Sequence, residues 1–215
     1  MKVIALISQK GGVGKTTLTG HLAVETEAAG DGPVVLLDTD PQGSLAAWWN
    51  AREAETPAFA NAQLSALPEQ IVSLEKAGYA YAFIDTPPAM TREIAAVVAQ
   101  ADLVVIPVKP SPHDLRAVGS TVELVEEAGK PFLFVVTMAK AASRLTAQSI
   151  AALSAHGPVS PAILGDRVDF AASMVDGRTV RELDAKSRSA AETAALWQFV
   201  RDRIARPVRT KARNI

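Results

Sequence analysis

The sequence predicts an α/β fold: a doubly wound, mostly parallel sheet with helices on both faces. Apolar runs of strand length alternate with segments of helical period along most of the 215 residues, which is the pattern of β–α–β units. Two of these runs, at 34–37 (VVLL) and 103–106 (LVVI), are continuously apolar, as strands covered on both faces are. A glycine-rich turn joins the first apolar run to the first helical segment. Together these observations indicate a parallel sheet.

Apolar runs place the expected strands, and stretches rich in glycine and proline place turns at 30–33, 87–88 and 129–131. We expect strands at 2–8, 33–38, 80–86, 103–108, 132–137 and 161–164. We expect helices at 15–29, 43–54, 66–77, 91–100, 113–128, 143–155 and 189–206. The stretch 156–188 is the hardest to assign. The sequence has no repeat and no long linker, so we expect 1–215 to form one domain, with 207–215 as a basic, candidate flexible tail.

Composition excludes several classes of protein. The chain is 48% apolar and 21% charged, which is typical of a globular protein rather than a disordered one. No apolar run approaches the roughly 20 residues of a membrane span, and the first residues read as a buried strand rather than a signal peptide, so we expect a cytoplasmic protein. Since there is no cysteine, disulfides, thiolate nucleophiles and iron–sulfur clusters are excluded. The three histidines show no metal-site spacing, and we expect them to be surface or packing residues.

Charge is spread unevenly along the chain. Residues 201–215 hold six basic side chains and one acidic one, whereas the remaining 200 residues hold 16 basic and 22 acidic side chains. The body therefore carries a net charge of −6 and the C-terminal segment +5. An acidic body with a basic end predicts a polyanionic partner at that end.

Residues 10–17 read KGGVGKTT, directly after the first expected strand and at the start of the first expected helix. Glycines let backbone N–H groups point at phosphate oxygens, and the helix N-terminus adds a partial positive charge. We expect Lys15 to neutralise the β- and γ-phosphates and Thr16 to place its hydroxyl on Mg²⁺. This motif predicts a P-loop NTPase whose nucleotide-binding residues are Gly11, Gly12, Val13, Gly14, Lys15, Thr16 and Thr17.

The generic P-loop pattern requires glycine where this chain has Gln9. The motif K-G-G-x-G-K-T instead resembles the deviant Walker A motif of the ParA/MinD superfamily of ATPases. The resemblance implies that Lys10 is the signature lysine of that superfamily, which reaches across a sandwich dimer to the partner's nucleotide. There it would act much as an arginine finger does, by stabilising charge in trans. The resemblance therefore implies ATP and Mg²⁺ as cofactors and an ATP-dependent homodimer.

Two further segments place aspartates at strand ends, where ligands bind in open α/β sheets. The segment 35–43 (VLLDTDPQG) resembles the superfamily's D-x-D-P-Q-G switch, which implies that Asp40 positions the attacking water and that Asp38 supports the magnesium shell. The segment 81–88 (YAFIDTPP) resembles its Walker B strand, with Asp85 on the metal side. The resemblance covers residues 1–138 well and the rest loosely. It gives Lys10, Lys15 and Asp40 catalytic roles and makes Thr16, Asp38 and Asp85 the metal-site residues.

Within the superfamily the sequence favours small ParA proteins that resemble ParF of plasmid partition, and the segment 107–115 resembles ParF's proline-containing segment. Iron–sulfur members need cysteines, and related tyrosine kinases need a tyrosine-rich tail that this chain lacks. A MinD-like membrane-cycling regulator stays open, because Leu196, Val200 and Ile204 share one helical face. We expect that face to pack on the sheet, and so we expect no stable membrane binding. A biosynthetic ATP-dependent ligase or amidotransferase also stays open, although short loops leave little room for a second substrate.

In ParA relatives, basic residues of the C-terminal part bind DNA without sequence preference. Phosphate contacts of this kind are strongly salt-dependent, and no base-reading motif is present. The resemblance implies a slow, nucleoid-associated ATPase that positions a cargo and is reset by a ParB-like or cargo-adaptor protein. The sequence identifies neither the cargo nor the adenine contacts. Candidate DNA-binding residues are Arg167, Arg178, Arg181, Lys186, Arg188, Arg201, Arg203 and Arg206.

Overall fold

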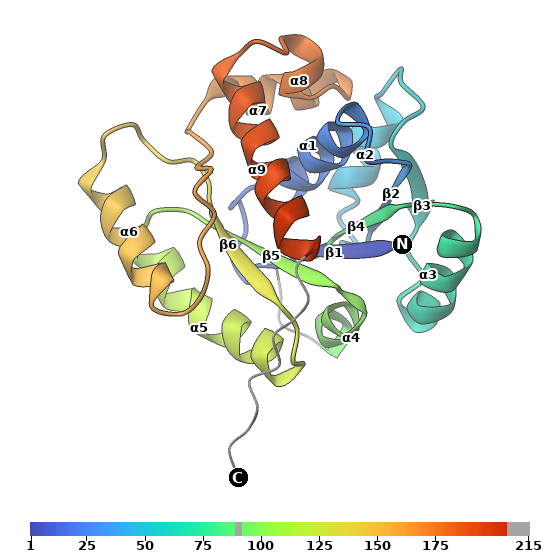
Figure 1. The fold of residues 1–215 in the computed structure, drawn as a ribbon, viewed down its shortest axis with the longest axis horizontal. Coiled ribbons are helices and arrows are strands. Elements are labelled where there is room, and N and C mark those ends of the chain that lie inside the picture. Colours follow the sequence, from blue (N-terminus) through green and yellow to red (C-terminus); the bar gives the residue numbers. More distant parts are fainter. Residues whose placement is uncertain (89–91, 206–215) are drawn as a thin grey trace.

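A computed structural model describes residues 1–88 and 92–205 of the chain (Figure 1). Its centre is a six-stranded sheet in the order β3–β2–β4–β1–β5–β6. All five pairings are parallel. The α/β fold with a parallel sheet is therefore confirmed. The strands are β1 (Lys2–Leu6), β2 (Val34–Asp38), β3 (Ala58–Asn61), β4 (Tyr81–Asp85), β5 (Leu103–Val108) and β6 (Phe132–Val136).

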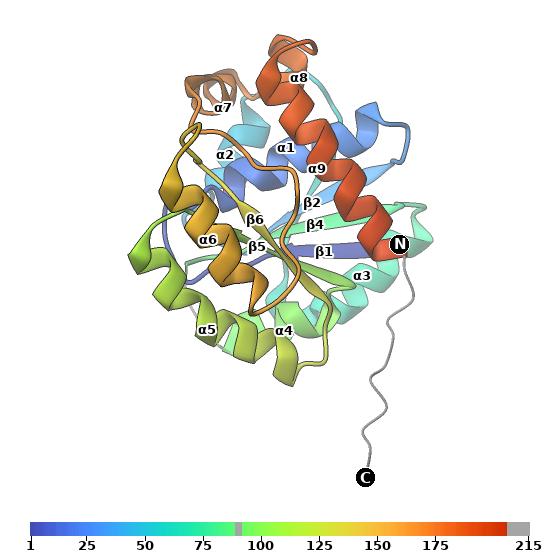
Figure 2. The ribbon, with the colours of Figure 1, turned by 60° about the vertical axis from the view of Figure 1, so that its left-hand side comes forward.

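Helices cover both faces of the sheet, as the two views show (Figures 1 and 2). One face carries α3 (Leu67–Lys76), α4 (Arg92–Gln100), α5 (Pro112–Glu127) and α6 (Arg144–Ser154). The other face carries α1 (Lys15–Ala28), α2 (Ser44–Asn50) and α9 (Arg188–Ala205). Short elements fill the connections: η1 (Leu64–Ala66), α7 (Val168–Ser173), η2 (Met174–Asp176) and α8 (Val180–Leu183).

The last helix, α9, packs its apolar side onto the sheet beside α1. Leu196, Trp197 and Val200 are buried in the same cluster as the β-strand side chains of that face. The Trp197 ring meets Tyr81 edge-on, with ring centroids 5.1 Å apart, and its indole N–H donates to the Asp31 carboxylate at 2.8 Å. The expectation that this helical face packs on the sheet is confirmed. Among residues 1–88 and 92–205, no helix combines the length and the apolar character that crossing a bilayer requires.

Two strand predictions differ from the structure. The edge strand β3 was not predicted, because its four residues follow Pro57 and include one large apolar side chain, Phe59. The predicted strand at 161–164 is wrong. That segment runs beside β6 and forms only isolated bridges, from Val159 to Phe134 and from Gly165 to Ala139. Pro158 and Pro161 have no N–H to donate, so a continuous ladder cannot form there.

The helix predicted at 43–54 ends at Asn50. The chain then turns at Arg52, whose side chain is almost fully buried and holds the turn in place. Its guanidinium donates to the carbonyls of Gly177 and Thr56 and pairs with Glu182 at 2.7 Å. A Cβ at Gly177 would lie only 2.4 Å from the Arg52 backbone nitrogen, so glycine is required for this close approach. The turn therefore fastens α2 to the segment before α8.

Candidate nucleotide-binding site

The glycine-rich loop lies at the carboxyl edge of the sheet, between β1 and α1. Gly12 and Gly14 have φ of 69° and 88°, the left-handed region that glycine adopts without steric cost. Gly14 is the N-cap of α1, so the first turn of that helix points its free N–H groups into the loop. The Thr137 hydroxyl, just after β6, donates to the Val13 carbonyl at 2.9 Å and fixes the loop from the other side. The predicted setting of the loop is confirmed.

Thr16 and Asp85 converge beside this loop because β1 and β4 are paired in register, Leu6 opposite Asp85. The Thr16 hydroxyl donates to Asp85 Oδ2 at 2.6 Å. Burial raises the pKa of Asp85 to about 7; the Thr16 hydrogen bond opposes this shift, the Asp38 charge adds to it, and the Lys15 charge opposes it. A cation placed here would favour the ionised carboxylate.

Hard oxygen donors of this kind are the ligands that Mg²⁺ prefers, so the residues present fit that ion. Within the part of the chain that the structure describes, no group of three or more His, Cys, Asp or Glu residues could hold a metal alone. Mg²⁺ at Thr16 and Asp85 would therefore take its remaining ligands from phosphate and water, as in other nucleotide sites.

Lys15 is a buried cation, with 7% of its surface exposed. Its ammonium approaches the Lys10 carbonyl at 3.5 Å. Burial lowers the pKa of Lys15, and the charges of Asp85 and then Asp40 oppose that shift. Because this buried ammonium has no ion pair within residues 1–88 and 92–205, a bound anion would strongly stabilise its charged form. The loop is thus prepared for phosphate at its centre.

The two aspartates of the segment after β2 have different surroundings. Both oxygens of Asp38 accept backbone N–H groups, from Asp40 and from Ala46, each at 3.0 Å. Asp40 uses Oδ1 to accept the Gln42 N–H at 2.9 Å. Across residues 1–88 and 92–205, the other oxygen of Asp40 has no hydrogen-bond partner. Asp38 therefore holds the backbone that presents Asp40, a contact the sequence did not reveal, and its predicted metal role stays a prediction.

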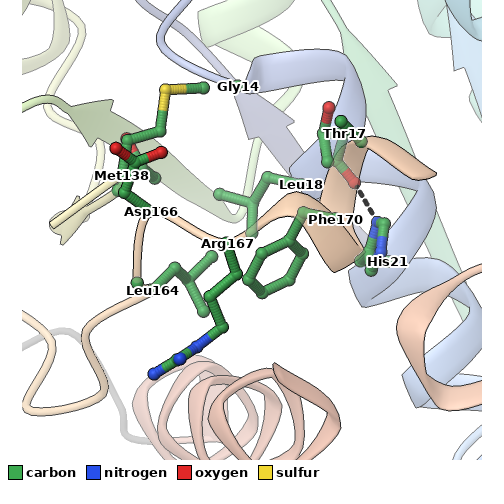
Figure 3. Close-up of a pocket in the computed structure, with 12 residues that line it drawn as sticks. Gly14, Thr17, Leu18, His21, Met138, Leu164, Asp166, Arg167 and Phe170 are labelled. Carbon is green, nitrogen blue, oxygen red and sulfur yellow. Dashed lines mark hydrogen bonds between the residues drawn. The ribbon is translucent and has the colours of Figure 1, made fainter. Parts of the chain in front are cut away.

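A cavity of about 160 Å³ opens beside the loop, next to Gly14 and Thr17 (Figure 3). One wall comes from α1, and the other comes from Met138 after β6 and from the segment 164–171. Its walls are largely apolar, and Asp166 and Arg167 also line it, which suits a heteroaromatic base and its sugar. This cavity was not predicted from the sequence, because much of its wall belongs to the stretch 156–188, where the hydrophobic pattern does not identify helices or strands. Its main lining side chains are Leu18, His21, Met138, Leu164, Arg167 and Phe170.

His21 joins this cavity wall to the start of α8. Its Nδ1 lies 2.7 Å from the Thr17 carbonyl, while its Nε2 lies 3.2 Å from the Val180 nitrogen and 3.2 Å from the Ser173 hydroxyl. Because the Val180 N–H can only donate, Nε2 accepts and Nδ1 carries the proton. Burial lowers the pKa of His21 to about 4; the Thr17 hydrogen bond and the Glu182 charge oppose this shift. The neutral ring is thus part of the folded structure, and His21 is confirmed as a packing residue.

This neutral histidine predicts acid sensitivity. The folded pKa, about 4, lies below the ordinary value of 6.5, so the unfolded chain binds the proton first. The contribution of His21 to stability is full above pH 6.5 and falls as the pH drops toward 4, by about 3 kcal/mol in total. The raised pKa values of Asp85 and Glu25 act in the opposite sense over the same range, so His21 is measured by comparison: between pH 7.5 and 4.5, urea unfolding should show that the parent protein loses about 3 kcal/mol more stability than His21→Gln. An equal pH dependence in the variant and the parent protein would contradict the assignment.

The predicted DNA-binding residues that the structure describes do not form one patch. Arg178, Lys186 and Arg188 lie around α8 and the start of α9, whereas Arg201 lies about 20 Å farther along α9. Arg203 is close to Arg201, and Arg206, like the predicted tail 207–215, lies outside the described residues.

Several of these cations are already paired. Arg167 binds Glu192 at 2.7 Å, Arg181 binds the nearly buried Glu25 at 3.1 Å, and Arg201 binds Asp31 at 3.2 Å. The pairs of Arg178 with Asp176 and of Arg188 with Glu192 are more exposed. Of the candidates in the described ranges, Lys186 and Arg203 have no ion pair. DNA contact by any of these residues stays a prediction.

The parallel sheet, the glycine loop with its buried lysine and the Thr16–Asp85 pair define a P-loop nucleotide-binding protein. Residues 4–180 match the family model described as the CobQ/CobB/MinD/ParA nucleotide binding domain. The chain belongs to this family, and the predicted membership of the ParA/MinD superfamily is confirmed.

Individual relatives agree with the family match. The chain is 31% identical over 198 residues to maintenance of carboxysome distribution protein A of Halothiobacillus neapolitanus, covering 88% of this chain and 91% of that protein. It is 33% identical over 129 residues to Protein ParA of Rhizobium radiobacter, covering 59% and 57% of the two chains. The septum site-determining protein MinD of Pyrococcus horikoshii, complexed with Mg-ADP, has the same fold, with a TM-score of 0.77 at 18% identity, covering 93% of this chain and 95% of that one.

Proposed function

We propose that this protein is a slow, partner-stimulated ATPase of the ParA type that dimerises on ATP, binds DNA without sequence preference and positions a cargo. The observation that carries the proposal is the convergence of Lys15, Thr16 and Asp85 at one loop, with Asp40 close enough for its charge to act on Lys15. This is the set of groups that phosphoryl transfer to water requires.

In this proposal each group has one task. Loop N–H groups and the Lys15 ammonium would bind the phosphates, and the cavity beside Gly14 would take the base and sugar. Mg²⁺ held by Thr16 and Asp85 would neutralise phosphate charge. The open oxygen of Asp40 would orient water for attack on the terminal phosphate, while Asp38 fixes the Asp40 backbone. Hydrolysis in the isolated protein is slow because the cation that completes the site comes from a partner subunit.

Lys10 is suited to be that cation. Its side chain is exposed, and within the described residues it has no hydrogen bond or ion pair. Its backbone carbonyl, by contrast, faces the Lys15 ammonium at the centre of the loop. The side chain can therefore extend toward the nucleotide of a second copy of the chain. Two P-loops would then face each other across an ATP-dependent homodimer.

The DNA surface would be built from the exposed cations near α8. Arg178 and Arg188 have exposed ion pairs with 51% and 76% of their side chains accessible, and such pairs contribute little to stability. They can therefore exchange their carboxylates for DNA phosphates, together with Lys186. The dimer brings two such surfaces onto one duplex, so DNA affinity rises with ATP.

The relatives indicate the class of cargo but not the particular cargo. One similar protein is named for carboxysome distribution and another is ParA, so a protein body or a DNA molecule is the cargo class that we propose. A ParB-like or cargo-adaptor protein would stimulate hydrolysis and reset the dimer, and the protein would then act on the nucleoid. A MinD-like cycle on membranes is the alternative. The described residues of α9 weigh against it, because the apolar face of this helix is buried against the sheet.

Sedimentation velocity tests the dimer. With Mg-ATP the protein is expected to sediment as a dimer, and with Mg-ADP as a monomer. Lys10→Gln is expected to retain ATP binding within about threefold but to weaken the dimer by at least about tenfold, since it removes one charge-assisted contact per nucleotide. Lys76→Gln, at the end of α3, is the matched control and should dimerise normally. A dimer that is equally stable with ADP, or unaffected by Lys10→Gln, would contradict the proposal.

A further inference from the structure

Lys109 is a third lysine at the glycine loop, besides Lys10 and Lys15. It directly follows β5, which pairs in parallel with β1 and so ends at the same edge of the sheet as the loop. The Ile7 N–H donates to the Val105 carbonyl at 3.0 Å and extends that pairing toward the loop. A methyl group placed on the Gly12 Cα would lie 3.8 Å from the Lys109 Nζ. The ammonium therefore lies against the loop itself.

The backbone of Lys109 is restrained, while its ammonium is unpaired within the described residues. Lys109 is partly buried, and within residues 1–88 and 92–205 its side chain has no ion pair or hydrogen bond. Pro110 restricts the backbone of Lys109, and the Lys109 carbonyl accepts the Ser111 N–H at 2.7 Å. Asp114, the next acidic residue in the chain, is bound to the Ser111 hydroxyl at the start of α5. The end of β5 thus carries a cation that no acidic residue of the described ranges pairs with.

We propose that Lys109 binds the terminal phosphate of the nucleotide held by its own subunit, and so distinguishes ATP from ADP. Lys15 is buried under the loop at the start of α1, whereas Lys109 approaches Gly12 from β5. A phosphate chain in the loop would lie between a cation from each side. An unpaired ammonium beside loop N–H groups contributes most to binding where the negative charge of the ligand is highest, which is at the terminal phosphate. This inference rests on the proposed nucleotide binding and adds a contact within the subunit to the contact across the dimer by Lys10.

Titration calorimetry with ADP and with a non-hydrolysable ATP analogue, each with Mg²⁺, tests the proposal. Lys109→Met keeps the length of the side chain and removes its charge. We expect this change to weaken binding of the ATP analogue by about 10- to 100-fold, which is the effect of losing one charge-assisted hydrogen bond. ADP affinity should change by less than about twofold. Lys109→Arg should restore most of the ATP affinity. Lys76→Met, the same change on an exposed lysine of α3, should alter neither affinity.

Three results would overturn the proposal. Unchanged affinities in Lys109→Met would show that the ammonium touches no phosphate. An equal loss for both nucleotides would place the contact elsewhere in the loop. A loss that occurs only at protein concentrations where the parent protein dimerises would place Lys109 in the interface rather than in its own site. If the parent protein binds neither nucleotide, the proposed function fails as well, and that outcome is separate from the three above.

Discussion

Asp40→Ala is expected to lower the rate of ATP hydrolysis by at least about 100-fold and to leave ATP binding within about threefold of the parent protein. Asp40 presents an open carboxylate oxygen near the loop, while the proposed phosphate-binding groups belong to α1, the loop and Lys109. Removing the carboxylate therefore removes the group that orients water without removing a phosphate contact. Phosphate release under single-turnover conditions measures the rate, and calorimetry measures the affinity.

The same variant should remain in its ATP-bound state. We expect Asp40→Ala to form a dimer with ATP that persists for many parent-protein turnovers and to stay bound to DNA. Asp40→Asn, which keeps the Gln42 N–H contact but lacks the negative charge, should behave in the same way. Hydrolysis within about threefold of the parent rate in both variants would show that Asp40 does not position the water.

Lys15→Gln is expected to weaken ATP binding by at least about 100-fold, because a buried charge-assisted contact to phosphate is lost. The folded protein without nucleotide should not be destabilised by this change. Burial already lowers the pKa of Lys15, which means that the empty site disfavours the charge. Loss of ATP binding and loss of fold are therefore separable for this residue.

Thermal unfolding with and without Mg-ATP measures both effects at once. At an ATP concentration 100 times the dissociation constant, the parent protein should gain about 2.7 kcal/mol of stability, and Lys15→Gln should gain almost none. A variant that unfolds without nucleotide at a much lower temperature than the parent protein would show that Lys15 is a structural residue. A variant stabilised by ATP as strongly as the parent protein would show that the loop lysine is not a phosphate ligand.

The site's centre was predictable from sequence because parallel strands end at one edge of a sheet. The motif at 10–17 follows β1, and Asp38 and Asp85 end the two neighbouring strands in register. No long-range contact had to be known for these groups to be placed together. The prediction of a strand at 161–164 was wrong for a local reason. Prolines in and before that segment interrupt the hydrogen-bond ladder, and apolar character alone does not reveal this.

Contacts that join distant segments could not be predicted. The His21 ring binds Ser173 and the Val180 N–H across more than 150 residues, and the cavity beside Gly14 needs Met138 in its wall. The ion pair of Arg181 with Glu25 likewise depends on α8 lying against α1. One sequence shows how much charge a segment carries, but not which charges the fold has already paired.

Fluorescence anisotropy of a labelled non-specific duplex tests the central claim most directly. With Mg-ATP we expect binding at least about tenfold tighter than with Mg-ADP, since two DNA surfaces then act together. The logarithm of the affinity should fall linearly with the logarithm of salt concentration. Lys186→Glu should weaken this binding, while Lys76→Glu, its matched control on α3, should not. Equal affinity with ATP and ADP would contradict a DNA-binding switch controlled by nucleotide.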